Sequence, residues 1–306
     1  MQPAYGAYST NSTIYIRADG SVNPSDAPII NDHDTTYTLT DEIYCTSGQN
    51  GIVVERSGIT LDGNGHTLNG SDRLGYGISL SSYHIGNVIV QNMSVNGFES
   101  CIVIYGSNNI LRWNNFTGAE NGVQLVGNQT LFASTTTNNV IDGNNVTDND
   151  VGVYLYESSD NNVTNNNIEN NLGAGIYLES SSNNIVVGNN LRNDSPGIGF
   201  YLSSDGMIYN NNIDGFFIDS GSKNVWDDGH RGNYWSDYLD QSPGASEIDN
   251  SGIWNAPYVI DDNNVDHCPL VNYIIIPEFP VAIALPMFML AAMLVAISHR
   301  KQNRKK

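Results

Sequence analysis

The chain repeats itself every 22 or 23 residues over much of its length. Three successive copies cover residues 135–157, 158–179 and 180–202, and fainter copies extend the series to about residues 81 and 218. Each copy holds three short apolar segments separated by turns rich in Asn, Gly, Ser and Asp. The repeat has the wrong length for a helical unit and lacks helical periodicity, so each copy is expected to form one coil of a parallel β-helix.

The third apolar segment of each copy indicates which side chains enter the core. Apolar residues alternate there with other types, as in a strand that is buried on one face. The predicted inward pairs are Ile78 and Leu80, Ile102 and Ile104, Val123 and Leu125, Val153 and Leu155, Ile176 and Leu178, and Phe200 and Leu202. The residues between the members of each pair should point outward: Ser79, Val103, Gln124, Tyr154, Tyr177 and Tyr201.

Asparagine accounts for 43 of the 306 residues, and the repeat explains this excess. One asparagine recurs once per coil, as Asn92, Asn115, Asn145, Asn167, Asn190 and Asn212. Stacked side-chain amides can hydrogen-bond along a solenoid, and Asn tolerates left-handed turn conformations. Most asparagines are therefore expected to hold the scaffold together rather than to form a binding site.

Acidic residues outnumber basic ones by 32 to 12, which gives a net charge of −20. Such a surface repels phosphate backbones, so nucleic-acid binding is not expected. The cysteines Cys45, Cys101 and Cys268 lack the spacing of metal ligands, and any single disulfide among them is open. Eight Asn-X-Ser/Thr sequons permit glycosylation, although a chain so rich in Asn, Ser and Thr contains several by chance.

Residues 280–298 form an uncharged apolar stretch that is followed at once by a basic cluster. This length suits a transmembrane helix, and the basic cluster predicts a cytoplasmic C-terminus, with everything before Pro277 outside the cell. A buried core helix is the alternative. No signal peptide is visible, so the true start is expected upstream; a tail-anchored protein facing the cytosol is the competing interpretation.

Specific sequence motifs suggest a family. The coils share the pattern NN-I-x-x-NN-I followed by G-I-Y-L, and the segments NVWDDG (224–229), GNYWSDY (232–238), APYVIDDNN (256–264) and DHCPL (266–270) come after them. These motifs resemble the repeats and the C-terminal cap of NosD-like proteins, also called carbohydrate-binding and sugar-hydrolase repeats, which are common on archaeal surfaces. Residues 14–22 and 51–68 resemble the matching N-terminal start. The resemblance covers about residues 13–275 and implies an all-β, right-handed parallel β-helix.

The residues Pro277, Glu278, Phe279 and Pro280, with the apolar stretch and basic end behind them, are similar to the PEF sorting tail of archaeal surface proteins. The resemblance implies a temporary membrane anchor that a sortase cuts near Pro277. Together the patterns divide the chain into five parts. They are a disordered segment (1–12), an N-terminal cap with the first coils (13–76), the β-helix repeats (77–220), a C-terminal cap (221–276) and a transmembrane sorting or anchor tail (277–306).

Three outward tyrosines, Tyr154, Tyr177 and Tyr201, are expected to stack at coil spacing, with Glu157 and Glu179 just beyond them. An aromatic strip suits carbohydrate, because a pyranose presents an apolar C–H face and Tyr adds a hydroxyl group. These five residues are the predicted carbohydrate-binding site. The alternative is that Tyr, a favoured strand residue, only packs against its neighbours.

The acids of the C-terminal cap could hold Ca²⁺ or could simply form an acidic surface. The candidate ligands are Asp237, Asp240, Asp249, Asp261 and Asp266. Relatives usually carry an Asp-Gly-rich, calcium-like run before the Pro-Tyr of the cap, and this chain has SEIDNSGIWNAPY (246–258) instead, which argues against calcium. Copper prefers clustered Met, Cys and His, which are dispersed here.

No catalytic residue is predicted, because the candidate bases Arg112, Arg192 and Arg231 fall on different coils without an aligned set of partners. The sequence favours a non-catalytic cell-surface module that binds or organises carbohydrate or cell-envelope components. One alternative is a carbohydrate-active lyase, hydrolase or epimerase, which requires two carboxylates, or an arginine with carboxylates, to converge in a groove. The other is a NosD-like accessory protein of copper-cofactor assembly.

Overall fold

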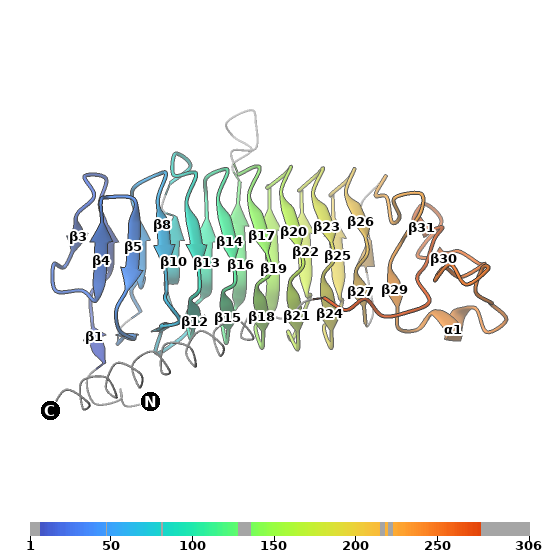
Figure 1. The fold of residues 1–306 in the computed structure, drawn as a ribbon, viewed down its shortest axis with the longest axis horizontal. Coiled ribbons are helices and arrows are strands. Elements are labelled where there is room, and N and C mark those ends of the chain that lie inside the picture. Colours follow the sequence, from blue (N-terminus) through green and yellow to red (C-terminus); the bar gives the residue numbers. More distant parts are fainter. Residues whose placement is uncertain are drawn as a thin grey trace, which may run out of the picture. The chain divides into compact units, whose positions relative to one another are not determined.

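Three long parallel β-sheets, wound by successive coils of the chain, form the molecule (Figure 1). The computed structural model describes residues 7–46, 48–80, 82–127, 136–214, 218–219 and 223–276. Each coil contributes one short strand to each sheet, and the equivalent strand of the next coil pairs with it in parallel. The parallel β-helix expected from the repeat is therefore confirmed.

Sheets A, B and C contain ten, ten and nine strands. Sheet A consists of β1 (Tyr8–Thr10), β6 (Ile43–Cys45), β9 (Thr67–Asn69), β12 (Ser94–Asn96), β15 (Asn115–Thr117), β18 (Asn145–Thr147), β21 (Asn167–Glu169), β24 (Asn190–Arg192), β27 (Asn212–Ile213) and β29 (Tyr234–Trp235). Sheet B consists of β3 (Val22–Asn23), β2 (Ile14–Ile16), β7 (Ile52–Val54), β10 (Tyr76–Leu80), β13 (Ser100–Ile104), β16 (Asn121–Val126), β19 (Val151–Tyr156), β22 (Ile176–Glu179), β25 (Ile198–Tyr201) and β28 (Ile218–Asp219). Sheet C consists of β4 (Ile29–Asp32), β5 (Thr36–Leu39), β8 (Thr60–Asp62), β11 (Ile89–Gln91), β14 (Ile110–Arg112), β17 (Val140–Asp142), β20 (Asn162–Thr164), β23 (Ile185–Val187) and β26 (Met207–Tyr209).

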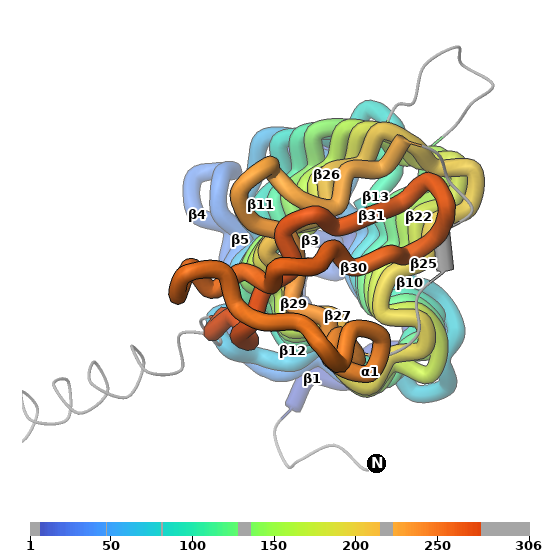
Figure 2. The backbone as a smooth tube through the Cα atoms, turned by 90° about the vertical axis from the view of Figure 1, so that its right-hand side faces the viewer, coloured from blue at the N-terminus to red at the C-terminus, as the bar shows by residue number. Residues whose placement is uncertain are grey.

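Local structures cover both ends of the solenoid. At the N-terminal end, β3 and β4 pair antiparallel with β2 and β5. At the other end, helix α1 (Tyr238–Gln241) and the antiparallel strands β30 (Tyr258–Val259) and β31 (Val265–Asp266) lie across the last coil (Figure 2). The Trp235 and Tyr258 rings stack there with centroids 4.1 Å apart, so aromatic side chains cover the apolar core at this end.

The predicted inward pairs are buried from Ile78 to Leu178. In the last pair Phe200 is buried as predicted, but the prediction for Leu202 is wrong, because Leu202 is 65% exposed. In sheet B, Ile176 aligns with Ile198, and Leu178 aligns with Phe200. The segment Gly-Ile-Gly-Phe (197–200) therefore aligns with Gly-Ile-Tyr-Leu (175–178). The repeat alignment had placed Phe200 next to Ile176, two residues earlier in that strand.

Fully buried asparagines connect successive coils inside the solenoid. The longest ladder consists of Asn114, Asn144, Asn166, Asn189, Asn211 and Asn233, all at most 2% exposed. The backbone N–H and the Nδ2 of Asn144 both donate to Oδ1 of Asn166, at 2.9 and 3.1 Å. The same Nδ2 also donates to the Leu111 carbonyl at 2.9 Å. Two shorter ladders run through Asn109, Asn139, Asn161 and Asn184, and through Asn149, Asn171 and Asp194.

The predicted asparagine ladder is a second, outer one. Nδ2 of Asn145 donates to Oδ1 of Asn115 at 2.7 Å, and Asn167 and Asn190 continue this chain at 2.9 and 2.7 Å. The prediction was wrong at the N-terminal end, because Ser94, not Asn92, aligns with Asn115. At the other end Asn212 aligns with Asn190 as predicted, but its side chain bonds to the backbone of Ile274.

Two inner ladders end on buried carboxylates. Asp266 accepts from the backbone N–H of Asn233 at 2.7 Å and from Nε1 of Trp235 at 2.9 Å, and burial raises its pKa to about 6. Oδ1 of Asp194 accepts from the backbone N–H and Nδ2 of Asn171, whereas its buried Oδ2 has no hydrogen-bond partner among the residues that the structure describes. Burial raises the pKa of Asp194 to about 7. Oδ2 of Asp194 is the counterpart of Nδ2 of Asn171 in the preceding coil of the ladder. That Nδ2 donates to the Val146 carbonyl, whereas a carboxylate oxygen cannot donate.

The inner ladder should matter more for stability than the outer one. Asn166→Ala should lower the free energy of unfolding by about 2–4 kcal/mol, because it leaves the Asn144 N–H and the Ile141 carbonyl buried without their partner. The neighbouring substitution Asn167→Ala is the matched control, because water can replace the bonds of this half-exposed side chain. Its expected loss is below about 1 kcal/mol. Urea unfolding followed by circular dichroism compares the two, and equal losses would contradict the ladder's role.

Asp194 should make stability depend on pH. Its folded-state pKa of about 7 lies above the unfolded value near 4, so the folded protein holds the proton more tightly and loses stability as pH rises from about 4 to about 7. Asp194→Asn supplies an amide donor and should raise the free energy of unfolding at pH 8 by about 2–4 kcal/mol, with little change at pH 4. Asp160→Asn, at an exposed turn, is the control. A gain of the same size at both pH values would count against the explanation.

Candidate functional site

The outer face of sheet B carries a group of tyrosines that we call the tyrosine face: Tyr154, Tyr156, Tyr177 and Tyr201, with Glu179. Tyr154 on β19 aligns with Tyr177 on β22, and their rings stack with centroids 5.7 Å apart and an interplanar angle of 29°. The hydroxyl of Tyr154 donates to Oε2 of Glu179 at 2.6 Å. Register between adjacent coils thus brings two of the predicted site tyrosines and one predicted glutamate together.

The third predicted tyrosine, Tyr201, lies in a different column. It aligns with Glu179 and not with Tyr177, because the register of the last coil differs from the repeat alignment. Gly199 occupies the position next to Tyr177, and a Cβ there would lie 2.9 Å from Cδ2 of the Tyr177 ring. The glycine therefore leaves room for the ring, while Tyr201 is 47% exposed beside it. The predicted stack of three tyrosines is corrected to a stacked pair with Tyr201 at its edge.

The tyrosine hydroxyls of this face are protonated, and their surroundings raise their pKa values further. Burial and the hydrogen bond to Glu179 raise the pKa of Tyr154, and the Glu157 carboxylate raises the pKa of Tyr156. Both hydroxyls are therefore neutral donors at physiological pH. The face combines aromatic rings, hydroxyl donors and carboxylate acceptors on strands whose backbones are fixed by neighbouring coils.

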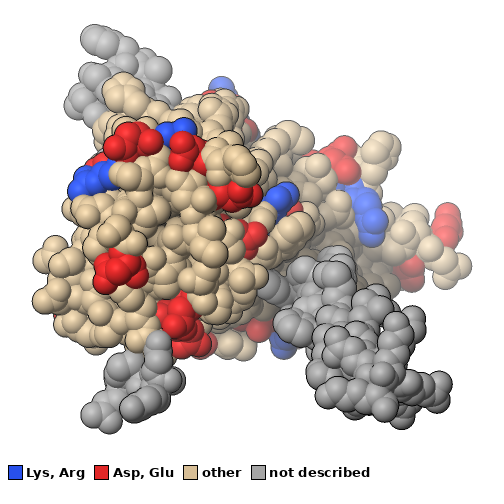
Figure 3. Space-filling model, turned by 60° about the vertical axis from the view of Figure 1, so that its left-hand side comes forward, with Lys and Arg blue, Asp and Glu red and all other residues tan. Residues whose placement is uncertain are grey.

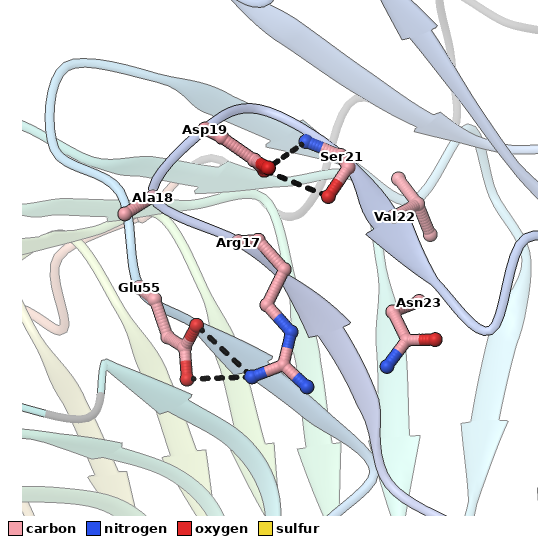
Figure 4. A pocket seen from close by; sticks show the side chains of 7 residues that line it. All are labelled: Arg17, Ala18, Asp19, Ser21, Val22, Asn23 and Glu55. Atoms are coloured by element: carbon pink, nitrogen blue, oxygen red, sulfur yellow. Dashed lines mark hydrogen bonds and ion pairs between the residues drawn. The ribbon is translucent and has the colours of Figure 1, made fainter.

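A shallow pocket lies on the same sheet near the N-terminal end, beside β2 and β3 (Figure 4). Its charged side chains pair with each other: Nη1 of Arg17 donates to both oxygens of Glu55, at 3.1 and 3.2 Å. The Arg17 guanidinium also lies over the Tyr15 ring, 3.9 Å from its centroid. Because these groups already have partners, the pocket is a weaker candidate than the tyrosine face.

The five candidate calcium ligands do not come together. Asp237 accepts from the Tyr258 hydroxyl, Asp261 accepts from its own turn, and Asp266 is buried beneath Trp235. Asp240 and Asp249 are exposed. In the part of the chain that the structure describes, no group of three or more His, Cys, Asp or Glu side chains could hold a metal ion.

The predicted C-terminal features lie outside the described residues. These are the sorting motif of Pro277, Glu278, Phe279 and Pro280 and the span at residues 280–298. Among the residues that the structure does describe, none of the helices is both long enough and apolar enough to cross a membrane. The side of the molecule drawn in Figure 3 carries more acidic than basic side chains, in line with the negative net charge of the chain.

A polar column on sheet C was not expected from the sequence. The register places Arg112 between Gln91 and Asp142 of the adjacent coils. Nε and Nη2 of Arg112 donate to Oε1 of Gln91 at 2.9 and 2.7 Å, and Nε2 of Gln91 donates to Asp62 at 2.7 Å. The expectation that Arg112 has no aligned partners was therefore wrong. The signal was present in Trp113, which stands where other coils have Asn or Gly.

Part of this chain is similar to a known protein family. Residues 127–239 match the model of a family described as periplasmic copper-binding protein (NosD). The match spans less than half of the chain and includes the tyrosine face but not Trp113. A search of the curated proteins found no significant match.

Several solved structures are similar to this chain at low sequence identity. XylC in complex with xylose is 16% identical, with 58% of this chain and 32% of that chain covered and a TM-score of 0.42. The periplasmic alginate epimerase AlgG is 17% identical, with 64% and 55% covered and a TM-score of 0.42. Pectate lyase Pel9A is 14% identical, with 71% and 76% covered and a TM-score of 0.39. The chain spans 32% and 55% of the length of the first two proteins, and no activity is drawn from these similarities.

The side chains present do not fit copper. Copper sites combine clustered thiolate, thioether and imidazole ligands. Burial raises the pKa of the Cys45 and Cys101 thiols to about 12, so neither is a thiolate at neutral pH. In the described part of the chain, the histidines likewise belong to no group of three or more potential ligands. No step through copper is derived for this chain.

Thiol accessibility tests this view of the cysteines. All three are free, and only Cys268 is partly exposed. Ellman's reagent should therefore modify Cys268 in the native protein and should reach Cys45 and Cys101 only after denaturation. Cys268→Ser should abolish the native reaction. Rapid reaction of a second thiol in the native state, or a disulfide in the purified protein, would contradict the structure.

Proposed function

We propose that this chain is an exported cell-surface protein that binds carbohydrate through its tyrosine face without chemically changing it. The observation that carries the proposal is the stacked pair of Tyr154 and Tyr177, with the Tyr154 hydroxyl fixed by Glu179. In this proposal residues 280–298 anchor the protein and Pro277 to Pro280 form its sorting motif. The periplasmic description of the partly matching family is consistent with a location outside the cytoplasm.

The chemistry of the tyrosine face suits sugars. The apolar C–H face of a pyranose can lie against an aromatic ring, while hydroxyl and carboxylate groups at the ring edges exchange hydrogen bonds with the sugar hydroxyls. Tyr201 offers an exposed ring, and Glu179 retains acceptor capacity beyond its bond to Tyr154. A net charge of −20 favours neutral saccharides over acidic ones.

Binding is favoured over catalysis by the way that the carboxylates are used. Glycoside hydrolysis needs two carboxyl groups on either side of the scissile bond, one of them serving as an acid. On the tyrosine face, Glu179 holds a tyrosine hydroxyl, and Glu157 follows β19 in a turn with φ of 51°. The pattern supports a fixed binding surface more than an acid and base pair. The copper-accessory alternative lacks fitting ligands.

The combined substitutions Tyr154→Ala and Tyr177→Ala should weaken binding of neutral oligosaccharides on a glycan array by about tenfold or more, because they remove the stacked rings. Full-length protein in a non-glycosidic detergent is the appropriate sample, since a sugar detergent would compete. Tyr44→Ala is the matched control: Tyr44 also donates to a carboxylate, Glu42 at 2.9 Å, but lies on sheet A. Unchanged retention in the double variant would refute the site, and release of cleaved sugar by the wild type would refute the non-catalytic role.

A further inference from the structure

We infer that Trp113, Arg112 and Asp142 form a second binding site, for a neutral saccharide, on sheet C and the turn that follows it. We call these three residues the Trp113 site. The inference goes beyond the tyrosine face, because it concerns a different sheet and different residues. It can hold whether or not the tyrosine face binds sugar.

The backbone at Trp113 is the first observation. The turn position after the sheet C strand has positive φ in six coils: Asn92 (54°), Trp113 (58°), Gly143 (63°), Asn165 (54°), Gly188 (72°) and Asn210 (54°). Asn and Gly tolerate this left-handed conformation, whereas a bulky side chain is strained in it. Strain of this kind is typical of functional positions. The other five coils of this series place Asn or Gly at this position and so avoid the strain. Turn formation alone therefore does not explain Trp113.

The side chain of Trp113 does not serve the core. It is 36% exposed, and its Nε1 has no hydrogen-bond partner among the residues that the structure describes. The next coil leaves room for it. A Cβ on Gly143 would lie 3.3 Å from Cδ1 and 3.5 Å from Nε1 of the indole. The ring thus lies against Gly143 of the next coil, while part of the side chain stays open to solvent.

Arg112 is held next to this ring. Its guanidinium carbon lies 4.7 Å from the indole centroid, in a cation–π arrangement. Nε and Nη2 donate to Gln91, which is itself fixed by Asp62. Within the described ranges, Nη1 makes no hydrogen bond. Gln91 thus fixes Nε and Nη2 of the guanidinium, and Nη1 remains able to donate to a ligand.

Asp142 supplies an acceptor one coil further on, about 4.8 Å along the sheet. Its Oδ1 accepts from Oγ1 of Thr164 at 2.7 Å and from Nδ2 of Asn165 at 2.8 Å. Oδ2 has no hydrogen-bond partner in the part of the chain that the structure covers. Among the described residues, Nη1 of Arg112 is thus an unused donor and Oδ2 of Asp142 an unused acceptor on the paired strands β14 and β17, and Nε1 of Trp113 adds a donor in the turn after β14.

A neutral saccharide matches this combination. Its C–H face suits the exposed indole, and a pair of hydroxyls can donate to a carboxylate while accepting from a guanidinium. Acidic saccharides fit less well, because Asp62 and Asp142 give the column two negative charges against the single positive charge of Arg112. Two sites on separate sheets would let one rod hold two glycan chains.

The test is Trp113→Asn, which installs the residue found at Asn92, Asn165 and Asn210. Binding of mannotriose, cellotriose, chitotriose and trigalacturonate is measured by calorimetry on the full-length protein, in a background carrying Tyr154→Ala and Tyr177→Ala. At least one neutral trisaccharide should bind and should lose about tenfold affinity in Trp113→Asn. The melting temperature should stay unchanged or rise, because the backbone strain is relieved. Tyr209→Asn, an aromatic on the same sheet, is the control and should leave binding unchanged.

Three results would overturn the inference. The first is that none of the neutral trisaccharides binds in the tyrosine-deleted background. The second is that trigalacturonate binds more tightly than every neutral probe. The third is that Trp113→Asn lowers the melting temperature without changing affinity, which would show that Arg112 and Trp113 only stabilise the turn. Failure of the tyrosine face is recorded separately, as equal binding with and without its two substitutions.

Discussion

Hydrogen bonds between buried asparagine side chains are the interaction on which the rest of the structure depends. Each inner asparagine accepts a hydrogen bond from the coil before it and donates one to the coil after it, so both ends of its buried side-chain amide have partners. The same side chain also donates to a backbone carbonyl of the sheet C strand in the preceding coil. Because a buried polar group without a partner is costly, this arrangement favours one register between coils over all others.

Fixed register determines what the outer surface can do. Side chains at equivalent positions of successive coils lie about 4.8 Å apart, close enough for rings to stack and for carboxylates to reach hydroxyls. Tyr154 and Tyr177 stack for this reason, and Arg112 reaches Gln91 for the same reason. The two surfaces differ in what they offer. The tyrosine face presents rings and hydroxyls. The Trp113 site combines one indole ring, on a residue with a strained backbone, with a charged donor and a charged acceptor.

The repeat length, the all-β solenoid and most inward residues could be predicted from the sequence, because burial on one face of a strand leaves a simple alternation. The inner ladder could not, since both asparagines of each Asn-Asn pair recur with the same spacing. Periodicity does not tell which of Asn144 and Asn145 is buried; the three-dimensional turn decides it. The misplacement of Tyr201 and Leu202 has a related cause. Two alignments of the Gly-Ile-Gly-Phe-Tyr-Leu segment fit the repeat, and only the pairing of Ile176 with Ile198 distinguishes them.

Amide hydrogen exchange of the full-length protein tests the central claim most directly, because the inner ladder uses backbone N–H groups that donate to side chains rather than to strands. The amides of Asn144, Asn166 and Asn189 donate to the Oδ1 atoms of the next coil at 2.9–3.0 Å. These three amides are expected to exchange only through global unfolding, as slowly as the strand amides of Val146 and Ile168. Exchange at the rate of an unprotected turn would contradict the claim that buried asparagines hold the coils in register.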